Sequence, residues 1–457
     1  MVRDRIEALS HHLSSPTPTK MSTPTRVFQL IPGVQSYDWG IPGSKAPRVA
    51  QFAAATKQLN FTADDDKPYA ELWMGTHPSM PSRIIPTESS ATGEFTPLAE
   101  HLAQHPELIG ERVRAKFSDG EPGALPFLFK VLSVGKALSI QAHPDKALGK
   151  KLHAQRPDVY KDPNHKPEMA IALTPFRGFC GFRPLAEIVA YIKNIPELAE
   201  LVQLSDDDVA RVASLASSPP ESDEVKQTLK TIFGNLMNAP KSTYEPLAQS
   251  LSERFASGRV DSVGETERKL VVKLADEFPR DVGIFCTFLL NISTLQPGEA
   301  LFLQANEPHA YLEGEILECM AASDNVVRAG LTPKLRDTDT LISMCTYQSG
   351  SNRGRLEPTH WAKSTTVKGT AQALLYDPPI AEFSVVTTTL AKDAVVQEAQ
   401  VDGPSIVLVL EGEVEIEGDG KVSVAKGQVA FVAAETRVSV QNVGDAEAKV
   451  ARAFVEP

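Results

Sequence analysis

The spacing of apolar residues changes twice along this chain of 457 residues, and this change most constrains the fold. Between residues 27 and 182, apolar runs are short and end at turn residues. Val27–Ile31 stops at Pro32-Gly33, and Phe127–Val134 stops at Gly135. Short apolar runs bounded by glycine and proline predict β-strands rather than helices.

Helical spacing replaces this pattern after residue 182. Leu185, Ile188, Val189 and Ile192 recur at i, i+3, i+4 and i+7, so they share one face of a helix. The same spacing returns twice before residue 279, and strand-like runs resume from residue 282. We therefore expect a mainly β protein whose first β domain is interrupted by a block of helices.

Strands with glycine-centred turns also fill the C-terminal part, notably residues 405–440. Closely spaced short strands are typical of small barrels and jelly rolls. The sequence therefore predicts two jelly-roll barrels with an α-helical domain inserted in the first. The expected divisions are a disordered tail (1–26), a first β domain (27–182 and 280–345), a helical insertion (183–279) and a second β domain (346–457).

The N-terminal tail is rich in Ser, Thr and Pro around residues 14–19, a composition that does not support a packed element. Acidic Asp4 and Glu7 argue against a transit peptide. We expect the tail to be dispensable for folding and activity.

Net charge and cysteine usage narrow the class of protein. The formal net charge of −12 argues against a nucleic-acid or anionic-membrane partner, and no apolar run reaches the length of a membrane span. The four cysteines are scattered and form no C-x-x-C pair, and three of them lie in apolar, strand-like surroundings that suit reduced, buried thiols. This usage fits the cytoplasm. We expect a monomer.

Polar residues alternate with apolar ones in the segment 138–146. Side chains on a strand point to alternate faces, so Ser139, Gln141 and His143 share one face. Three polar groups aimed into a barrel need partners, because each unpaired buried group costs roughly 1–3 kcal/mol. A metal ion would supply a partner; a solvated strand face is the alternative.

Two further segments carry metal-ligand chemistry. Lys166 and Glu168 share a strand face opposite Met169, which fits either a salt bridge or a carboxylate ligand. His309 follows a Pro-Gly-Glu turn and a strand, the order found in the second metal-binding motif of cupins. Two imidazoles, an amide and a carboxylate suit zinc and leave such a site with a charge of about +1, a Lewis acid.

Basic residues offer a second chemistry. Arg328 lies in an apolar run that ends at Gly330, where an unused charge is costly. With Lys130, Lys166 and Lys334 it could line a phosphate pocket. Separate surface salt bridges are the alternative.

Taken together, these motifs resemble the type I mannose-6-phosphate isomerase family in its fungal form. The similar segments are residues 32–40, residues 69–77 and the motifs around Gln141, Glu168, His309 and Arg328. The resemblance implies a cupin-type catalytic domain, a helical insertion and a cupin-like C-terminal domain without metal. It also implies one zinc ion per chain, held by Gln141, His143, Glu168 and His309, with Arg328 in the active site.

The activity implied by the resemblance is interconversion of D-mannose 6-phosphate and D-fructose 6-phosphate, which feeds GDP-mannose synthesis for glycosylation and the cell wall. The chemistry needs a general base that moves a proton between C1 and C2 through an enediol. Glu318, Lys166 and His165 are the candidates. Lys130, Ser139 and Lys334 are candidate contacts to the substrate.

Two rival functions use the same fold. A non-catalytic sugar-phosphate sensor would tolerate loss of Arg328 or of a ligand, yet all are present. An Fe(II) dioxygenase is disfavoured, because such cupins generally present an H-x-H pair, whereas Gln141 stands at the first position here.

Overall fold

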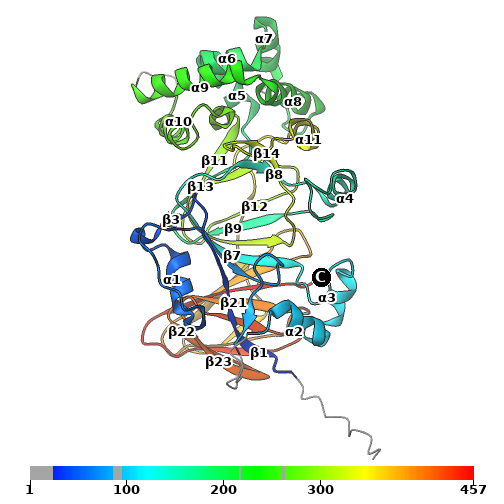
Figure 1. The fold of residues 1–457 in the computed structure, drawn as a ribbon, viewed down its shortest axis with the longest axis vertical. Coiled ribbons are helices and arrows are strands. Elements are labelled where there is room, and N and C mark those ends of the chain that lie inside the picture. The colour runs from blue at the N-terminus through cyan, green and yellow to red at the C-terminus, as the bar shows by residue number, and fades with distance from the viewer. Residues whose placement is uncertain (1–23, 86–94, 216–217, 259–262) are drawn as a thin grey trace, which may run out of the picture.

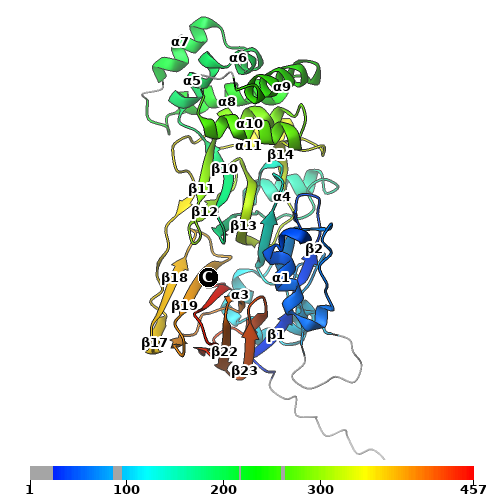
Figure 2. The ribbon, with the colours of Figure 1, turned by 90° about the vertical axis from the view of Figure 1, so that its left-hand side faces the viewer.

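The computed structural model describes residues 24–85, 95–215, 218–258 and 263–457. Its helices and strands form a stack of layers along one long axis, with the helical block at one end and the C-terminal strands at the other (Figure 1, Figure 2). The expected tail, residues 1–26, lies almost entirely outside the described residues. In the described part of the chain, no helix combines the length and apolar character that a membrane crossing requires.

An eleven-stranded sheet carries the central layers. Its longest strand, β13 (His309–Ala321), pairs antiparallel with β7 (Phe127–Val134) over eight residues, and its N-terminal half reaches β8 and β10. The other strands of this sheet are β2 (Gly33–Gln35), β5 (Glu71–Met74), β8 (Ile140–Ala142), β9 (Glu168–Ala172), β10 (Phe176–Phe182), β11 (Leu290–Leu295), β12 (Ala300–Leu303), β14 (Val327–Gly330) and β15 (Arg355–Leu356).

The C-terminal part forms two further sheets that pack face to face around a core of valine, isoleucine and alanine side chains. The five-stranded sheet contains β17 (Ser364–Lys368), β20 (Val395–Glu398), β25 (Val438–Asn442), β22 (Glu413–Gly418) and β23 (Gly420–Ala425). The eight-stranded sheet contains β16 (Thr359–His360), β18 (Ala371–Tyr376), β19 (Ser384–Leu390), β26 (Ala448–Phe454), β21 (Ser405–Glu411), β24 (Val429–Val432), β1 (Val27–Ile31) and β6 (Arg83–Ile84).

The first described strand lies in the sheet of the C-terminal part. β1 inserts between β24 and β6, with Leu30 opposite both Val429 and Ile84. The other face of this sheet packs on the eleven-stranded sheet through one core that includes Phe129, Leu408 and Phe431. The two β parts therefore share a core.

The helical block is an excursion between two neighbouring strands. β10 and β11 pair antiparallel, and the chain between them forms α5 to α10 before it returns through the 3₁₀ helix η5. The bounds are α5 (Leu185–Asn194), α6 (Pro196–Val202), α7 (Asp206–Leu215), α8 (Asp223–Asn238), α9 (Lys241–Ala256), α10 (Glu265–Glu277) and η5 (Val282–Phe288). The apolar face predicted for α5 is buried as expected.

Helices also occur where only strands and turns were expected. The described residues of the block 27–182 form four α-helices, and one more follows β14. They are α1 (Arg48–Ala55), α2 (Leu98–Gln104), α3 (Glu111–Lys116), α4 (Lys146–Gln155) and α11 (Thr338–Met344). With about 31% strand and 30% helix, the protein is mixed rather than mainly β.

The two expected barrels do not appear as closed barrels. No sheet of the described residues closes on itself: the eleven-stranded sheet branches at β13 toward β10 and β8, and the other sheets have an open strand order, including the small pair of β3 (Ile41–Pro42) and β4 (Pro68–Tyr69). The expected helical insertion is present. All four cysteines are free and buried, one more than the three for which burial was expected.

The position of β1 gives a prediction about the N-terminal boundary. A chain that starts at residue 24 should fold like the full chain, whereas one that starts at residue 32 should not fold. Val27, Phe28, Leu30 and Ile31 are all buried, and their burial contributes about 6–12 kcal/mol, comparable with the whole stability of a domain. Circular dichroism and thermal melts of the two truncations test this. A cooperative melt from the shorter chain would show that β1 is not required.

Candidate metal centre and active site

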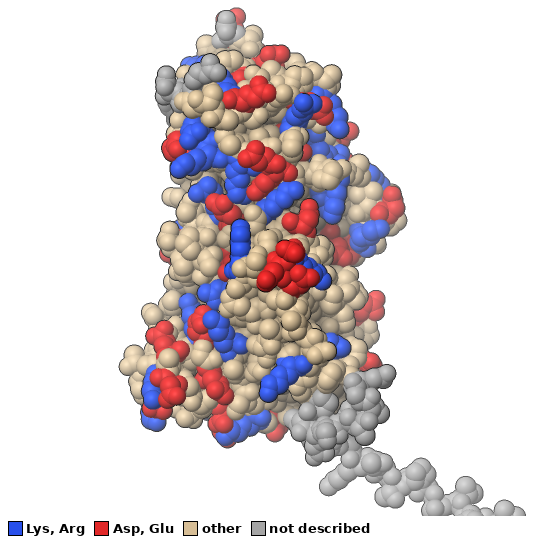
Figure 3. Space-filling model, turned by 60° about the vertical axis from the view of Figure 1, so that its left-hand side comes forward, with Lys and Arg blue, Asp and Glu red and all other residues tan. Residues whose placement is uncertain are grey.

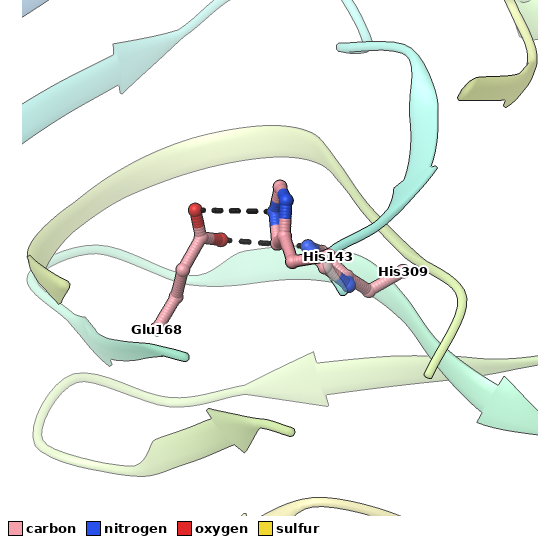
Figure 4. Close-up of side chains that lie close together, drawn as sticks. All are labelled: His143, Glu168 and His309. Atoms are coloured by element: carbon pink, nitrogen blue, oxygen red, sulfur yellow. Dashed lines mark ion pairs between the residues drawn. The ribbon is translucent and has the colours of Figure 1, made fainter. Parts of the chain in front are cut away.

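Three side chains from different strands converge in the central layers. Glu168 begins β9, His309 begins β13, and His143 follows β8 directly. All three residues are buried, and at most 1% of the surface of each is exposed. The Glu168 carboxylate faces both rings, with Oε1 at 3.3 Å from His143 Nε2 and Oε2 at 3.4 Å from His309 Nε2 (Figure 4).

The tautomer of each histidine follows from its second nitrogen. His143 Nδ1 lies 2.7 Å from the carbonyl oxygen of Asn325, and His309 Nδ1 lies 3.0 Å from that of Glu307. A carbonyl only accepts hydrogen bonds, so each Nδ1 carries the proton and each Nε2 presents a lone pair. Both Nε2 atoms are buried, and neither has a hydrogen-bond partner among the residues that the structure describes.

This set of donors fits a zinc ion. Two neutral imidazoles and a carboxylate, each imidazole held by a carbonyl on its far side, form the arrangement that protein zinc sites use. The donor atoms lie within 4.8 Å of one another. Burial lowers the pKa of His143 to about 4, so this imidazole stays neutral and able to bind a metal at neutral pH.

Gln141 joins this centre through strand register. On β8 it lies opposite His309 of β13 on one side and opposite Arg328 of β14 on the other. Side chains at paired positions of antiparallel strands lie on the same face. The predicted fourth ligand and the predicted active-site arginine are therefore neighbours of the histidine pair.

Glu168 is held ionised by its surroundings. Burial is the largest single influence and opposes ionisation. The Lys166 ammonium, 3.2 Å from Oε1, and the two neighbouring histidines together outweigh it and lower the pKa of Glu168 well below its usual range. The hydroxyl of Tyr311 donates a hydrogen bond to the second carboxylate oxygen at 3.4 Å.

A second charge cluster adjoins the first. Lys130 of β7 and Glu318 of β13 lie opposite each other in the ladder, with Nζ 3.1 Å from Oε2. Lys130 Nζ also lies 3.7 Å from Glu71 Oε1 and 4.8 Å from the centre of the Trp73 ring, whose indole N–H donates to Glu71. Burial alone would lower the pKa of Lys130, but the two carboxylates raise it.

The pKa of Glu318 moves in the opposite direction from that of Glu168. Burial raises the pKa of Glu318, and the nearby carboxylates of Glu168 and Glu71 add to the rise against the effect of Lys130. With all groups ionised, Glu168, Glu318 and Glu71 outnumber Lys130 and Lys166 by one charge. The buried cluster therefore carries an excess negative charge that a divalent cation would offset.

Three residues of these clusters were not predicted from the sequence: Glu71, Trp73 and Tyr311. Trp73 pairs with Lys130 across β5 and β7, a register that periodicity alone does not give. Tyr311 lies two residues after His309 on the same strand face, so alternation could have found it.

Other predicted residues lie at the edges of these clusters. Arg328 is half-buried and forms no ion pair with the described residues, and burial lowers its pKa. Ser139 is half-buried just before β8, while Lys334 is exposed. His165 is turned toward the C-terminal part, with Nε2 2.5 Å from Glu382 Oε1.

Comparisons with known proteins place the chain in a family. It is 48% identical over 448 residues to the mannose-6-phosphate isomerase of Cryptococcus neoformans var. neoformans serotype D, covering 94% of this chain and 99% of that protein. It is 44% identical over 440 residues to the mannose-6-phosphate isomerase of Saccharomyces cerevisiae, with the same coverage of each chain. The chain belongs to the type I phosphomannose isomerase family.

Family profiles and solved structures agree. Profiles of the type I phosphomannose isomerase catalytic domain, helical insertion domain and C-terminal region match residues 27–185, 202–290 and 373–424. A mutant phosphomannose isomerase from Salmonella typhimurium superposes with a TM-score of 0.75 at 29% identity, covering 94% of this chain and 100% of that one. A zinc-bound mannose 6-phosphate isomerase superposes with a TM-score of 0.74 at the same identity and coverage.

The buried cluster around Lys130 gives a prediction about stability. Lys130→Met should lower the free energy of unfolding by about 3–5 kcal/mol, because it leaves Glu318 and Glu71 buried without their cation. Adding Glu318→Gln to that variant should recover part of the loss. Urea unfolding of the single and double variants at neutral pH measures both effects. An unchanged midpoint for Lys130→Met would mean that water already compensates these carboxylates.

Proposed function

We propose that this protein is a zinc-dependent isomerase that interconverts D-mannose 6-phosphate and D-fructose 6-phosphate. The observation that carries the proposal is the pair of unpartnered imidazole nitrogens facing Glu168 in a buried cluster with excess negative charge. The relatives named mannose-6-phosphate isomerase and the zinc-bound structural neighbour support it.

The proposed ligands of one zinc ion per chain are Gln141, His143, Glu168 and His309. Bound there, zinc supplies a Lewis acid that polarises carbonyl and hydroxyl oxygens of a sugar. The chain itself fixes the ligands: carbonyls orient both rings, and Lys166 and Tyr311 hold the carboxylate.

The reaction moves one proton between carbons and a second between oxygens. A base removes the proton from C2 of the open-chain aldose phosphate, and the C1 oxygen gains a proton as the enediol forms. The base then returns its proton to C1, while the C2 hydroxyl loses its proton and becomes the carbonyl of the ketose. We assign the base to Glu318, because a raised pKa brings a carboxyl group closer to the pH at which it can both accept and release a proton.

The other two candidate bases take different roles in this proposal. Lys166 already pairs with Glu168, so it is proposed to hold the ligand and contact substrate oxygens. The Nε2 atom of His165 is hydrogen-bonded to Glu382 Oε1. We keep both as the alternatives that substitution must exclude.

Positive charge near Gln141 would stabilise the enediolate and bind phosphate. Arg328 has no carboxylate partner in the described residues, so its charge is free to act on the substrate. Lys130, Ser139 and Lys334 are proposed as further contacts. Of these, Lys334 is the exposed cation suited to a phosphate, whereas the charge of Lys130 is already balanced.

We further propose the finer assignments expected from the sequence. Both β parts are proposed to be of the cupin jelly-roll type, with domain boundaries at residues 182, 279 and 345. The protein is proposed to be a cytoplasmic monomer that supplies GDP-mannose synthesis.

No nucleic-acid or membrane partner is proposed. On the face of the molecule drawn in Figure 3, Lys and Arg side chains are interspersed with Asp and Glu.

Metal removal tests the proposed function directly. Protein freed of metal with a chelator should lose isomerase activity on mannose 6-phosphate, because the imidazole pair then has no cation to act through, and one equivalent of zinc should restore it. A coupled assay and metal analysis of the same samples measure rate and content. Full activity in protein shown to be metal-free would refute the proposal.

Arg328→Ala should reduce kcat by roughly 10²–10³ while zinc content stays the same, since a fixed charge in a half-buried site acts mainly on the transition state. Arg437→Ala, at an exposed position in the C-terminal part, is the matched control. A raised KM with unchanged kcat would assign Arg328 to phosphate binding instead.

A further inference from the structure

The segments that carry His143 and His309 are joined by very little strand pairing. β8 and β13 pair at a single position, where Gln141 lies opposite His309. Yet the rings of His143 and His309 lie 4.9 Å apart at a tilt of 53°. Something beyond strand pairing must hold the two segments at this separation.

Asn306 makes that connection. Its backbone N–H donates to the carbonyl oxygen of His143 at 2.7 Å. Its side chain exchanges two hydrogen bonds with Asp145: the Asp145 N–H donates to Oδ1 at 3.2 Å, and Nδ2 donates to Asp145 Oδ2 at 2.8 Å. Asn306 lies three residues before His309, and Asp145 lies two residues after His143.

Further hydrogen bonds hold both Asn306 and Asp145 in place. The carbonyl oxygen of Asn306 accepts a hydrogen bond from the backbone N–H of Thr346, whose hydroxyl donates to Glu307. Asp145 Oδ1 accepts the N–H of Leu148 and so caps α4. The contact therefore ties the start of a helix to the turn that leads into β13.

The backbone at Asn306 explains the residue type. Its φ of 63° lies in the left-handed region, which asparagine and aspartate tolerate better than other residues with side chains. Glycine would allow this conformation but could not reach Asp145. Asparagine meets the backbone requirement and also supplies one acceptor and one donor in the right order.

We infer that Asn306 and Asp145 form a clasp that positions His143 and His309 for metal binding. They are positioning residues, because neither is one of the proposed ligands. The inference rests on the proposed zinc site, and its effect should appear in metal affinity itself. Loss of an outer partner of this kind typically costs about 10–100-fold in metal affinity.

Exchanging the two residue types tests the clasp. Asn306→Asp alone sets two carboxylates against each other, and Asp145→Asn alone sets two amide donors against each other. The double variant Asn306→Asp/Asp145→Asn restores a donor facing an acceptor. In the double variant the new amide oxygen at position 145 can still cap α4, and the backbone N–H there still meets an acceptor.

Zinc dissociation constants, measured on purified full-length protein by competition with a chelator, are the main readout. Each single variant should bind zinc about 10–100-fold more weakly than the wild-type protein, and the double variant should return to within a few-fold of it. The visible absorption of the cobalt-substituted proteins should shift in the single variants and return in the double. Asn60→Asp, also at a left-handed asparagine but in the turn after α1, should leave zinc affinity unchanged.

Wild-type zinc affinity in both single variants would overturn the clasp, and so would a double variant that stays as weak as the singles. If Asn306→Asp does not fold, the comparison of Asp145→Asn with the double variant decides in the same way. A wild-type protein that binds no zinc would instead refute the proposed function.

Discussion

The buried Glu168 carboxylate, facing two imidazole lone pairs, is the interaction on which the rest of the site depends. Three electron-rich groups aimed at one point repel one another, and the donors beside them, Lys166 and Tyr311, contact the carboxylate rather than the imidazole nitrogens. Burial raises that cost, because little solvent is present to screen it. The arrangement becomes favourable only with a cation among the three groups, so the clusters around it serve to keep this electron-rich point in place.

The layered fold provides the rigidity that such a point needs. Glu168 and His309 stand at the ends of strands that pair in the centre of the eleven-stranded sheet, packed on the C-terminal sheet below. Above them, the helical block shares a core with β8, β10 and β14. Because β10 and β11 are adjacent strands, the long excursion through the helices closes where the sheet already brings its ends together.

Sequence reasoning could place three of the proposed ligands on strand faces because two-residue alternation is a local property. Gln141, His143 and Glu168 could be assigned to strand faces from their own neighbours. Glu71 and Trp73 could not, because their place beside Lys130 depends on which strands pair and in which register. Asn306 and Asn325 were missed for a related reason, since the partner of each, in the turn around His143, lies far away in the sequence.

The missed helices show a different limit. α1 carries the alanine-rich run around Phe52, and α4 begins after Asp145, whose carboxylate caps it. Both signals are readable in the sequence. They were overlooked because each helix is short and lies among strand-like runs, so the whole region was interpreted as strands and turns. The open sheets differ from the expected barrels because short strands with glycine turns suit either form.

The C-terminal part has no histidine near the metal centre, yet it cannot be regarded as an independent appendage. β1, from the N-terminal end of the described chain, pairs inside its sheet, so the two β parts cannot separate without breaking a ladder.

Glu382, in the turn before β19, is hydrogen-bonded to His165, one residue from Lys166. The burial of Glu382 opposes its ionisation, but the hydrogen bond and charge of His165 keep its pKa lowered. The segment that carries Lys166 and Glu168 is thus anchored from below by the C-terminal part, while β8 and its turn pack against the helical core. The candidate metal centre lies between the C-terminal part and the helical block, so its geometry depends on contacts with both.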